Sequence, residues 1–194
     1  CESISKFNED KEIISPIIKK LKNNGINVNG PFSADTIFNN KNSDIDLTDW
    51  VLKDEDDDHE FLFSDGTILK SGNYAIIVRD SVKFKEVYDH SVDILGEMDF
   101  GLAGGSDDVR IFDNFGVIID SVSYDDESPW PVEADGQGYS LELINIESDN
   151  SIAESWQASK YAQGSPGLEN GILIDNEKYN SNSVSYTHLR AHET

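Results

Sequence analysis

The sequence is poor in cysteine and in long hydrophobic runs. Cys1 is the only cysteine, which excludes an intramolecular disulfide, a cysteine-based metal cluster and a redox pair within these residues. No apolar run approaches the roughly 20 residues that a helix needs to cross a bilayer. We therefore expect a chain that is held together by a hydrophobic core and has no membrane span.

Basic residues are scarce as well. The chain carries 15 Lys and Arg against 38 Asp and Glu, a formal net charge of -23. Such a surface repels a phosphate backbone, so nucleic acid is disfavoured as a partner. A surface this acidic is typical of proteins that bind cations or basic partners or that work in a salty medium. The competing interpretation is that the charge only keeps the protein in solution. The charge by itself names no partner.

The motifs of common catalytic sites are also missing. The sequence has no G-x-S-x-G elbow, no Walker-type phosphate loop and no H-E-x-x-H pair. Residues 101–105 are glycine-rich, but neither a helical pattern nor a lysine follows them, so we interpret them as a turn between strands. Outside the C-terminal tail only His59 and His90 remain for acid–base chemistry. We predict a protein that is not an enzyme and needs no cofactor.

The length of 194 residues suits one domain. Residues 1–12 are polar and lack a sustained period, which is typical of a linker. We place the domain at residues 13–171 and the start of a second linker at 172–183. Residues 184–194, VSYTHLRAHET, look like the translation of a sequencing adapter and do not enter the fold prediction. Cys1 is either the lipid-carrying first residue of a mature lipoprotein or an arbitrary fragment start.

Short apolar runs begin at Ala34 and are broken by Asp, Asn and Gly about every ten residues, a spacing typical of a β-sandwich or barrel. Residues 13–18 precede them and contain Pro16, which suits an edge strand, although a helix over 17–23 competes. Residues 23–31 have the composition of a loop. The further strands are expected at residues 36–38, 45–52, 60–63, 74–79, 109–112, 116–123 and 139–144.

Local motifs predict a hairpin, further turns and one short helix. Asp113 and Asn114 start a turn and Gly116 accepts a positive φ, so residues 111–118 are the clearest hairpin. Further reversals are expected at 65–66 and 71–73 for the same reason. Residues 82–95 are the one place where a short surface helix is expected to interrupt the strands.

An ordered series of motifs resembles the lamin tail domain of bacterial extracellular proteins. It runs through Phe38-Asn39-Asn40, Asp46-Leu47-Thr48-Asp49-Trp50-Val51-Leu52, Phe63-Ser64-Asp65-Gly66-Thr67 and Gly72-Asn73-Tyr74-Ala75-Ile76-Ile77-Val78-Arg79-Asp80. Its most diagnostic part is Asp120-Ser121-Val122-Ser123-Tyr124, Pro129-Trp130-Pro131 and Ala134-Asp135-Gly136-Gln137-Gly138-Tyr139-Ser140-Leu141-Glu142-Leu143, before Trp156-Gln157-Ala158-Ser159 and Gly164-Ser165-Pro166-Gly167. The sequence departs from the family pattern near the first strands, at Ser15-Pro16 and at Thr36.

The resemblance implies an all-β, immunoglobulin-like β-sandwich of seven to nine strands. Family members sit in exported proteins beside nuclease, phosphoesterase or kinase-like domains, and the family has no catalytic residues to transfer. The first hypothesis is therefore an extracellular or cell-surface module that binds a protein or another surface ligand. The second is an accessory domain of a hydrolase, of nuclease or phosphoesterase type, whose catalytic part follows residue 183.

Two sets of side chains are candidates for binding. Asp54, Asp56 and Asp58 alternate, which is the spacing that lets oxygens converge on calcium. An EF-hand would need glycine where His59 stands and a bidentate glutamate where Asp65 stands, so a solvated acidic loop is the competing interpretation. Two further acidic runs have the same two interpretations, residues 107–108 and 125–127. The three tryptophans form either an aromatic ligand platform or part of the core, at Trp50, Trp130 and Trp156.

Overall fold

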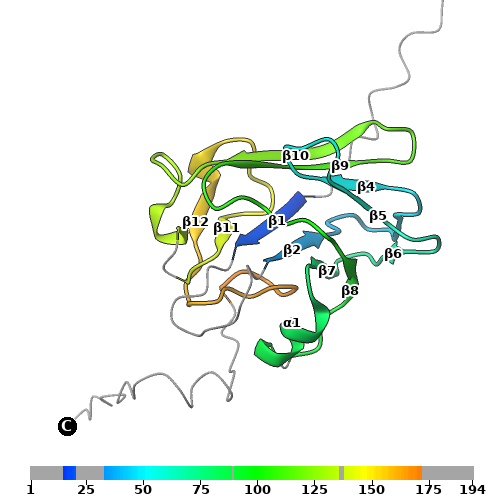
Figure 1. Cartoon of the computed structure of the whole chain (residues 1–194), viewed down its shortest axis with the longest axis horizontal. Coiled ribbons are helices and arrows are strands. Elements are labelled where there is room, and N and C mark those ends of the chain that lie inside the picture. The colour runs from blue at the N-terminus through cyan, green and yellow to red at the C-terminus, as the bar shows by residue number, and fades with distance from the viewer. Residues whose placement is uncertain (1–14, 21–32, 89, 136–137, 172–194) are drawn as a thin grey trace, which may run out of the picture.

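The computed structural model describes residues 15–20, 33–88, 90–135 and 138–171. The expected linkers at 1–12 and 172–183, the loop at 23–31 and the adapter-like residues 184–194 lie outside these ranges. The described part consists of short strands and one short α-helix (Figure 1). Within it, no helix has the length and apolar character that a membrane span requires.

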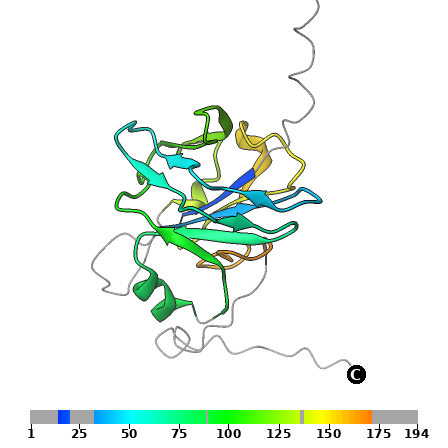
Figure 2. The same ribbon diagram turned by 90° about the vertical axis from the view of Figure 1, so that its right-hand side faces the viewer.

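Two four-stranded sheets form the body of the molecule. The first has the order β1-β2-β7-β8 and is made of β1 (Ser15–Lys20), β2 (Ser33–Phe38), β7 (Tyr74–Val78) and β8 (Ile94–Glu97). The second has the order β10-β9-β4-β5 and is made of β10 (Ile118–Tyr124), β9 (Asp107–Phe112), β4 (Val51–Lys53) and β5 (Glu60–Leu62). β7 and β8 pair in parallel, and the other neighbours pair antiparallel. Figure 2 shows the two layers.

Smaller elements complete the fold. The short pairs are β3 (Ile45–Asp46) with β6 (Ile68–Leu69) and β11 (Leu141–Leu143) with β12 (Trp156–Ala158). The helices are α1 (Ser81–Val87) and the 3-10 turns η1 (Val132–Ala134) and η2 (Ala153–Ser155). The predicted immunoglobulin-like β-sandwich is confirmed, while the described residues form twelve strands, β1 to β12, where seven to nine were expected, because several of them are only two or three residues long.

The predicted hairpin at residues 111–118 is present between β9 and β10. Phe112 pairs with Ile118, and Gly116 takes a φ of 75°. The Asp113 carboxylate closes the turn because its Oδ1 accepts from the backbone N–H of Phe115 at 2.9 Å and of Val117 at 2.8 Å. The edge strand with Pro16 is also present, as β1, and its six residues extend through Lys20 where the competing prediction had a helix.

Two predicted elements are wrong in extent. The single strand at 45–52 is two short strands, because Asp46 Oδ1 accepts from Thr48 N at 2.9 Å and Asp49 then takes a φ of 61°. The helix at 82–95 stops at Val87, since Tyr88 returns to an extended conformation, and the rest leads into β8. Asp80 caps that helix, accepting from Lys83 N at 2.9 Å.

The main core fills the space between the two sheets. Ile37 and Ile77 contribute to it from the first sheet, and Leu52, Val109 and Ile111 from the second, all with 0% exposed surface. A second, smaller cluster lies on the outer face of the first sheet, where α1 covers it with Phe84. β7 is therefore buried on both faces, which explains its uninterrupted apolar sequence.

The three tryptophans belong to the core or its margin. Trp156 is 3% exposed, and its Nε1 donates to the Asn150 carbonyl at 2.9 Å. Trp50 and Trp130 are half-buried and pack against the same cluster, with Trp130 6.1 Å from Trp156 between ring centroids. This arrangement favours the core interpretation over the exposed ligand platform.

Two acidic side chains on the inward faces of the sheets are buried, Asp35 and Asp120. Asp35 shares the inward face of β2 with Ile37 and is 2% exposed, and among the described residues neither of its oxygens has a hydrogen-bond partner. Burial, followed by the negative charge of Asp107, raises the pKa of Asp35 from its ordinary 3.8 to about 7. A second inward acid, Asp120 on β10, accepts from Asn150 Nδ2 at 2.9 Å, and burial raises its pKa to about 7 as well.

We predict that Trp156→Ala lowers the free energy of unfolding by about 3–5 kcal/mol, because the indole is fully buried. Trp50→Ala is the matched comparison, and its loss should be smaller because that ring is only half-buried. Urea denaturation followed by circular dichroism measures both. Equal losses in the two variants would contradict the different burial of the two rings.

We predict that Asp35 makes the fold less stable as pH rises. Between pH 4 and 7 the native state keeps a proton that the unfolded chain has already released, because the pKa of Asp35 is raised on folding. Asp35→Asn removes this dependence, so between pH 5 and 8 the variant should gain roughly 2 kcal/mol relative to the parent. Denaturation midpoints across this pH range test it. Asp65→Asn, an exposed turn carboxylate, is the control, and parallel profiles for Asp35→Asn and the parent would disprove the assignment.

Candidate functional site: the acidic end of the sandwich

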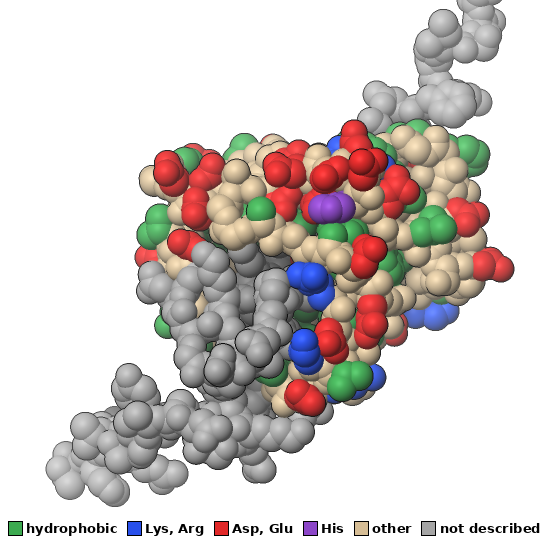
Figure 3. Space-filling view, in the orientation of Figure 1, with side chains coloured by type: hydrophobic (Ala, Val, Ile, Leu, Met, Phe, Trp, Pro, Cys, Tyr) green, Lys and Arg blue, Asp and Glu red, His purple; other side chains and the backbone are tan. Residues whose placement is uncertain are grey.

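Acidic side chains gather at the end of the molecule where the β4–β5 loop meets the segment before β9. In Figure 3, Asp and Glu side chains lie along the upper side, where Figure 1 places β4, β9 and β10. Residues 55–60 are all exposed. This end holds the three aspartates that the sequence singled out.

The β4–β5 loop is held in shape by its own carboxylates. Asp54 Oδ1 accepts from Asp56 N, and Asp56 Oδ1 accepts from Asp58 N, each at 2.9 Å. His59 N donates to the Asp56 carbonyl at 3.1 Å. These are the local side-chain-to-backbone turns that Asp favours. Asp54 and Asp56 therefore stabilise the fold of the loop.

Asp54 is the buried member of the three. It is 3% exposed, and its Oδ2 lies 2.8 Å from His59 Nδ1. The hydrogen bond to Asp54 is the main cause that raises the pKa of His59, and the charges of Asp54, Asp56 and Asp99 add to it. The His59 ring stacks on Phe100 with centroids 5.1 Å apart.

Arg110 on β9 connects the loop to the sheet. Its Nε donates to the Asp54 carbonyl, and its Nη1 lies 2.9 Å from Asp57 Oδ1, which makes an ion pair. Lys53 supports the other side, with Nζ donating to the Asp57 carbonyl at 2.9 Å. Two cations thus offset part of the negative charge, while Asp56 and Asp58 stay exposed.

Asp107 is a buried anchor beneath this loop. Its carboxylate accepts from three backbone N–H groups, those of Glu55 at 3.1 Å, Ala103 at 2.5 Å and Asp108 at 2.8 Å. Tyr124 OH donates to the Ala103 carbonyl at 2.8 Å. Burial, together with the charge of Asp107 and other nearby acids, raises the pKa of Tyr124, so its hydroxyl stays a donor. Asp107 thereby joins two loops that are far apart in the sequence.

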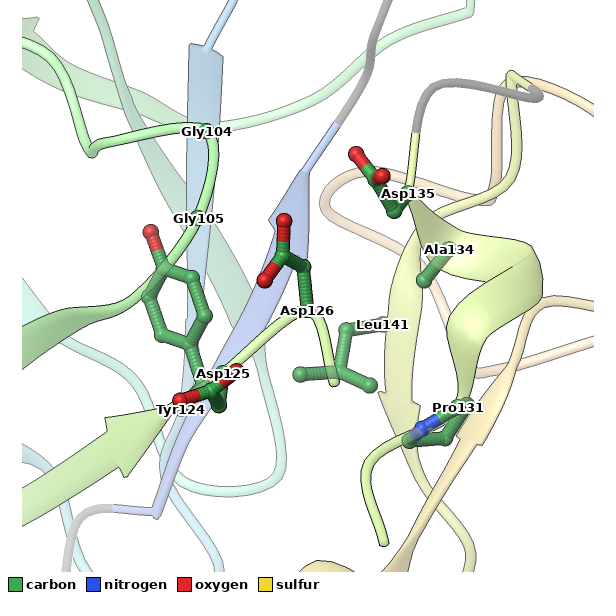
Figure 4. Close-up of a pocket in the computed structure, with 9 residues that line it drawn as sticks. All are labelled: Gly104, Gly105, Tyr124, Asp125, Asp126, Pro131, Ala134, Asp135 and Leu141. Carbon is green, nitrogen blue, oxygen red and sulfur yellow. The ribbon is translucent and has the colours of Figure 1, made fainter. Parts of the chain in front are cut away.

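A small pocket opens beside these loops. Figure 4 shows Asp126 between Tyr124 and Leu141, with Asp135 across the opening. Its other lining residues are Gly104, Gly105, Asp125, Pro131 and Ala134. Its lining combines apolar side chains with three carboxylates, so it favours a cationic group over an anionic one.

The structure places Asp54, Asp56 and Asp58 in one loop but turns Asp54 inward, away from the two exposed carboxylates. Within the described residues, no group of three or more His, Cys, Asp or Glu side chains is arranged to hold a metal ion. Calcium binding at these three residues stays a prediction. The glycine-rich residues 101–105 form a loop between β8 and β9, as expected.

Sequence reasoning missed Asp35 and the anchoring role of Asp107. A signal for Asp35 was available, because alternation along β2 places it on the same face as the apolar Ile37. Asp107 gives no such signal, since its link to the β4–β5 loop comes from Glu55 N, 52 residues away, which only the fold brings close.

Comparison with known proteins identifies the family. No curated protein matches this sequence. A family model described as Lamin Tail Domain matches residues 16–126, which is more than half of the 194-residue chain. The match runs from β1 to just past β10, and β11 and β12 lie beyond it while adding Leu141, Leu143 and Trp156 to the same core. The chain therefore belongs to the lamin tail domain family, whose members are non-catalytic immunoglobulin-like domains.

Proposed function

We propose that this domain is a non-enzymatic interaction or anchoring module of a secreted or cell-surface bacterial protein, and that it binds a protein or another cell-surface ligand. The observation that carries the proposal is membership of a family of immunoglobulin-like interaction domains. The sandwich supports it, because a rigid core presents loops whose shape is fixed by hydrogen bonds such as those of Asp54 and Asp107. The acidic surface favours a ligand with positive charge.

The proposal includes the location of the protein. In an exported protein, Cys1 is the residue that would carry a lipid anchor. The gene sequence before Cys1 and after Ser183, read from genomic DNA, tests this. A lipoprotein signal peptide that ends at Cys1 supports the proposal. A nuclease or phosphoesterase domain after Ser183 would favour the accessory-domain hypothesis instead.

We predict that the fluorescently labelled domain binds in a saturable manner to cell envelopes of the organism that encodes it. Unlabelled domain should compete, and binding should weaken as salt increases because the domain is strongly acidic. Sedimentation of the envelopes measures the bound fraction, and protease treatment distinguishes a protein ligand from another surface ligand. The Trp156→Ala variant, unfolded by heat, is the control for non-specific adsorption. Binding that does not saturate, or that the unfolded control reproduces, would contradict the proposal.

Calcium is a further proposed ligand, and it has its own test. Asp56 and Asp58 are exposed, while Asp54 must exchange its contact with His59 before it can join them. If calcium binds there, the melting temperature should rise with calcium as RT ln(1 + [L]/Kd) requires, and magnesium should do less. The double variant Asp56→Asn, Asp58→Asn keeps the turn acceptors and should lose the shift. A shift that sodium chloride reproduces at matched ionic strength would mean that the loop is only screened.

A further inference from the structure

The sandwich has one side where two sheet edges face solvent. β5 is the last strand of one four-stranded sheet and β8 the last strand of the other. Figure 2 views the molecule from this side. A groove runs between the two edges, lined by residues of β5 and of the segment from Leu95 to Asp99. On the other side of the sandwich, β11 packs against the edge strand β1.

Backbone groups on both edges point away from their own sheets. Phe63 N donates to the Trp50 carbonyl at 2.9 Å, so antiparallel alternation turns the N–H and C=O of Leu62 away from β4. Met98 N donates to the Val78 carbonyl at 2.8 Å, so Glu97 likewise turns its own backbone groups away from β7. In the described part of the chain, no backbone hydrogen bond joins β5 to β8. Both edges therefore offer donors and acceptors to an added strand.

The floor of the groove is apolar and closely packed. Phe61 and Met98 are buried beneath it, and Leu62 is 59% exposed at its margin. Gly96 allows this packing, because a Cβ at that position would lie only 2.6 Å from the Phe61 ring. The groove is thus built by fitting an aromatic ring under a strand that lacks a side chain at that point.

The rim of the groove carries one sign of charge. Glu60, Glu97 and Asp99 line it, and none of its described lining residues is Lys or Arg. Lys53 lies close by, but it forms an ion pair with Glu60. The acidic loop adjoins the groove, since the charge of Asp99 acts on His59. These charges repel an acidic segment and attract a basic one.

We propose that this groove binds an extended, basic peptide segment of a partner protein, which adds as a strand along β8. This rests on the proposed function as an interaction module and names its surface and the chemistry of its partner. β8 is the longer of the two edges, with four residues against three. Backbone hydrogen bonds to β8 supply affinity, the apolar floor takes every second side chain, and the acidic rim selects lysine or arginine at the others.

The backbone part of the proposal is tested with N-methylated peptides. The probe is a fluorescein-labelled nine-residue peptide in which Lys alternates with Val and Thr, measured by fluorescence anisotropy with the full chain. Methyl groups on alternate amides block one edge of the peptide, and two isomers block opposite edges. Strand addition predicts that one isomer loses about tenfold or more in affinity and the other keeps most of it. Equal effects of the two isomers, or no binding of the parent peptide, would overturn the proposal.

The location is tested with charge variants. Asp99→Lys reverses a charge on the rim and should weaken peptide binding about tenfold. Glu154→Lys makes the same change in net charge on an exposed residue of η2, away from the groove, and should leave the affinity within about twofold. Amide chemical shifts should move at 60–64 and 94–99 when the peptide binds.

Equal weakening by the two variants would mean general attraction to an acidic protein and would refute the groove. The envelope-binding assay keeps this result separate from the proposed function. If the Asp99→Lys domain binds envelopes as well as the parent does, the groove proposal fails while the interaction module stands.

Discussion

The contact between the inner faces of the two sheets is the constraint on which the rest of the structure depends. Ile37 and Ile77 meet Val109 and Ile111 across a layer that excludes water, and removing this apolar surface from water is the main favourable term of folding. The position of the acidic β4–β5 loop and that of the groove both follow from that layer. The acidic loop and the segment before β9 emerge at one end of it, and the groove lies where the layer meets solvent between β5 and β8.

A chain with a net charge of -23 must place its acids without unfolding itself. This domain places several of them as acceptors for backbone N–H groups in turns, as Asp46, Asp56 and Asp113 do. Such bonds satisfy donors that a turn would otherwise leave to water, so the acids contribute to loop structure as well as to charge. Asp35 is different, because it lies in the core without a hydrogen-bond partner among the described residues, and burial raises its pKa to about 7.

The sequence predicted those parts of the fold that depend on neighbours in the chain. The hairpin at Gly116 follows from residues within the turn, and the two-faced burial of β7 follows from its own apolar run. The sequence did not predict β8. This strand pairs in parallel with β7, and it contains Gly96, a residue with low strand propensity. At the acidic end the alternation of Asp54, Asp56 and Asp58 was visible, but the inward turn of Asp54 depends on His59 and Arg110, and the latter comes from a distant strand.

An open pair of sheet edges is normally a hazard, because a second copy of the same chain can pair with it. In this molecule Glu97 and Asp99 disfavour that pairing, since two copies would bring the same negative charges together, while Glu60 is paired with Lys53. A basic strand meets the opposite condition. Its charges are attracted where those of a second copy are repelled, while its backbone finds the same hydrogen-bonding groups. In the proposed complex, the acids that disfavour pairing between two copies are therefore also the ones that select a basic partner strand.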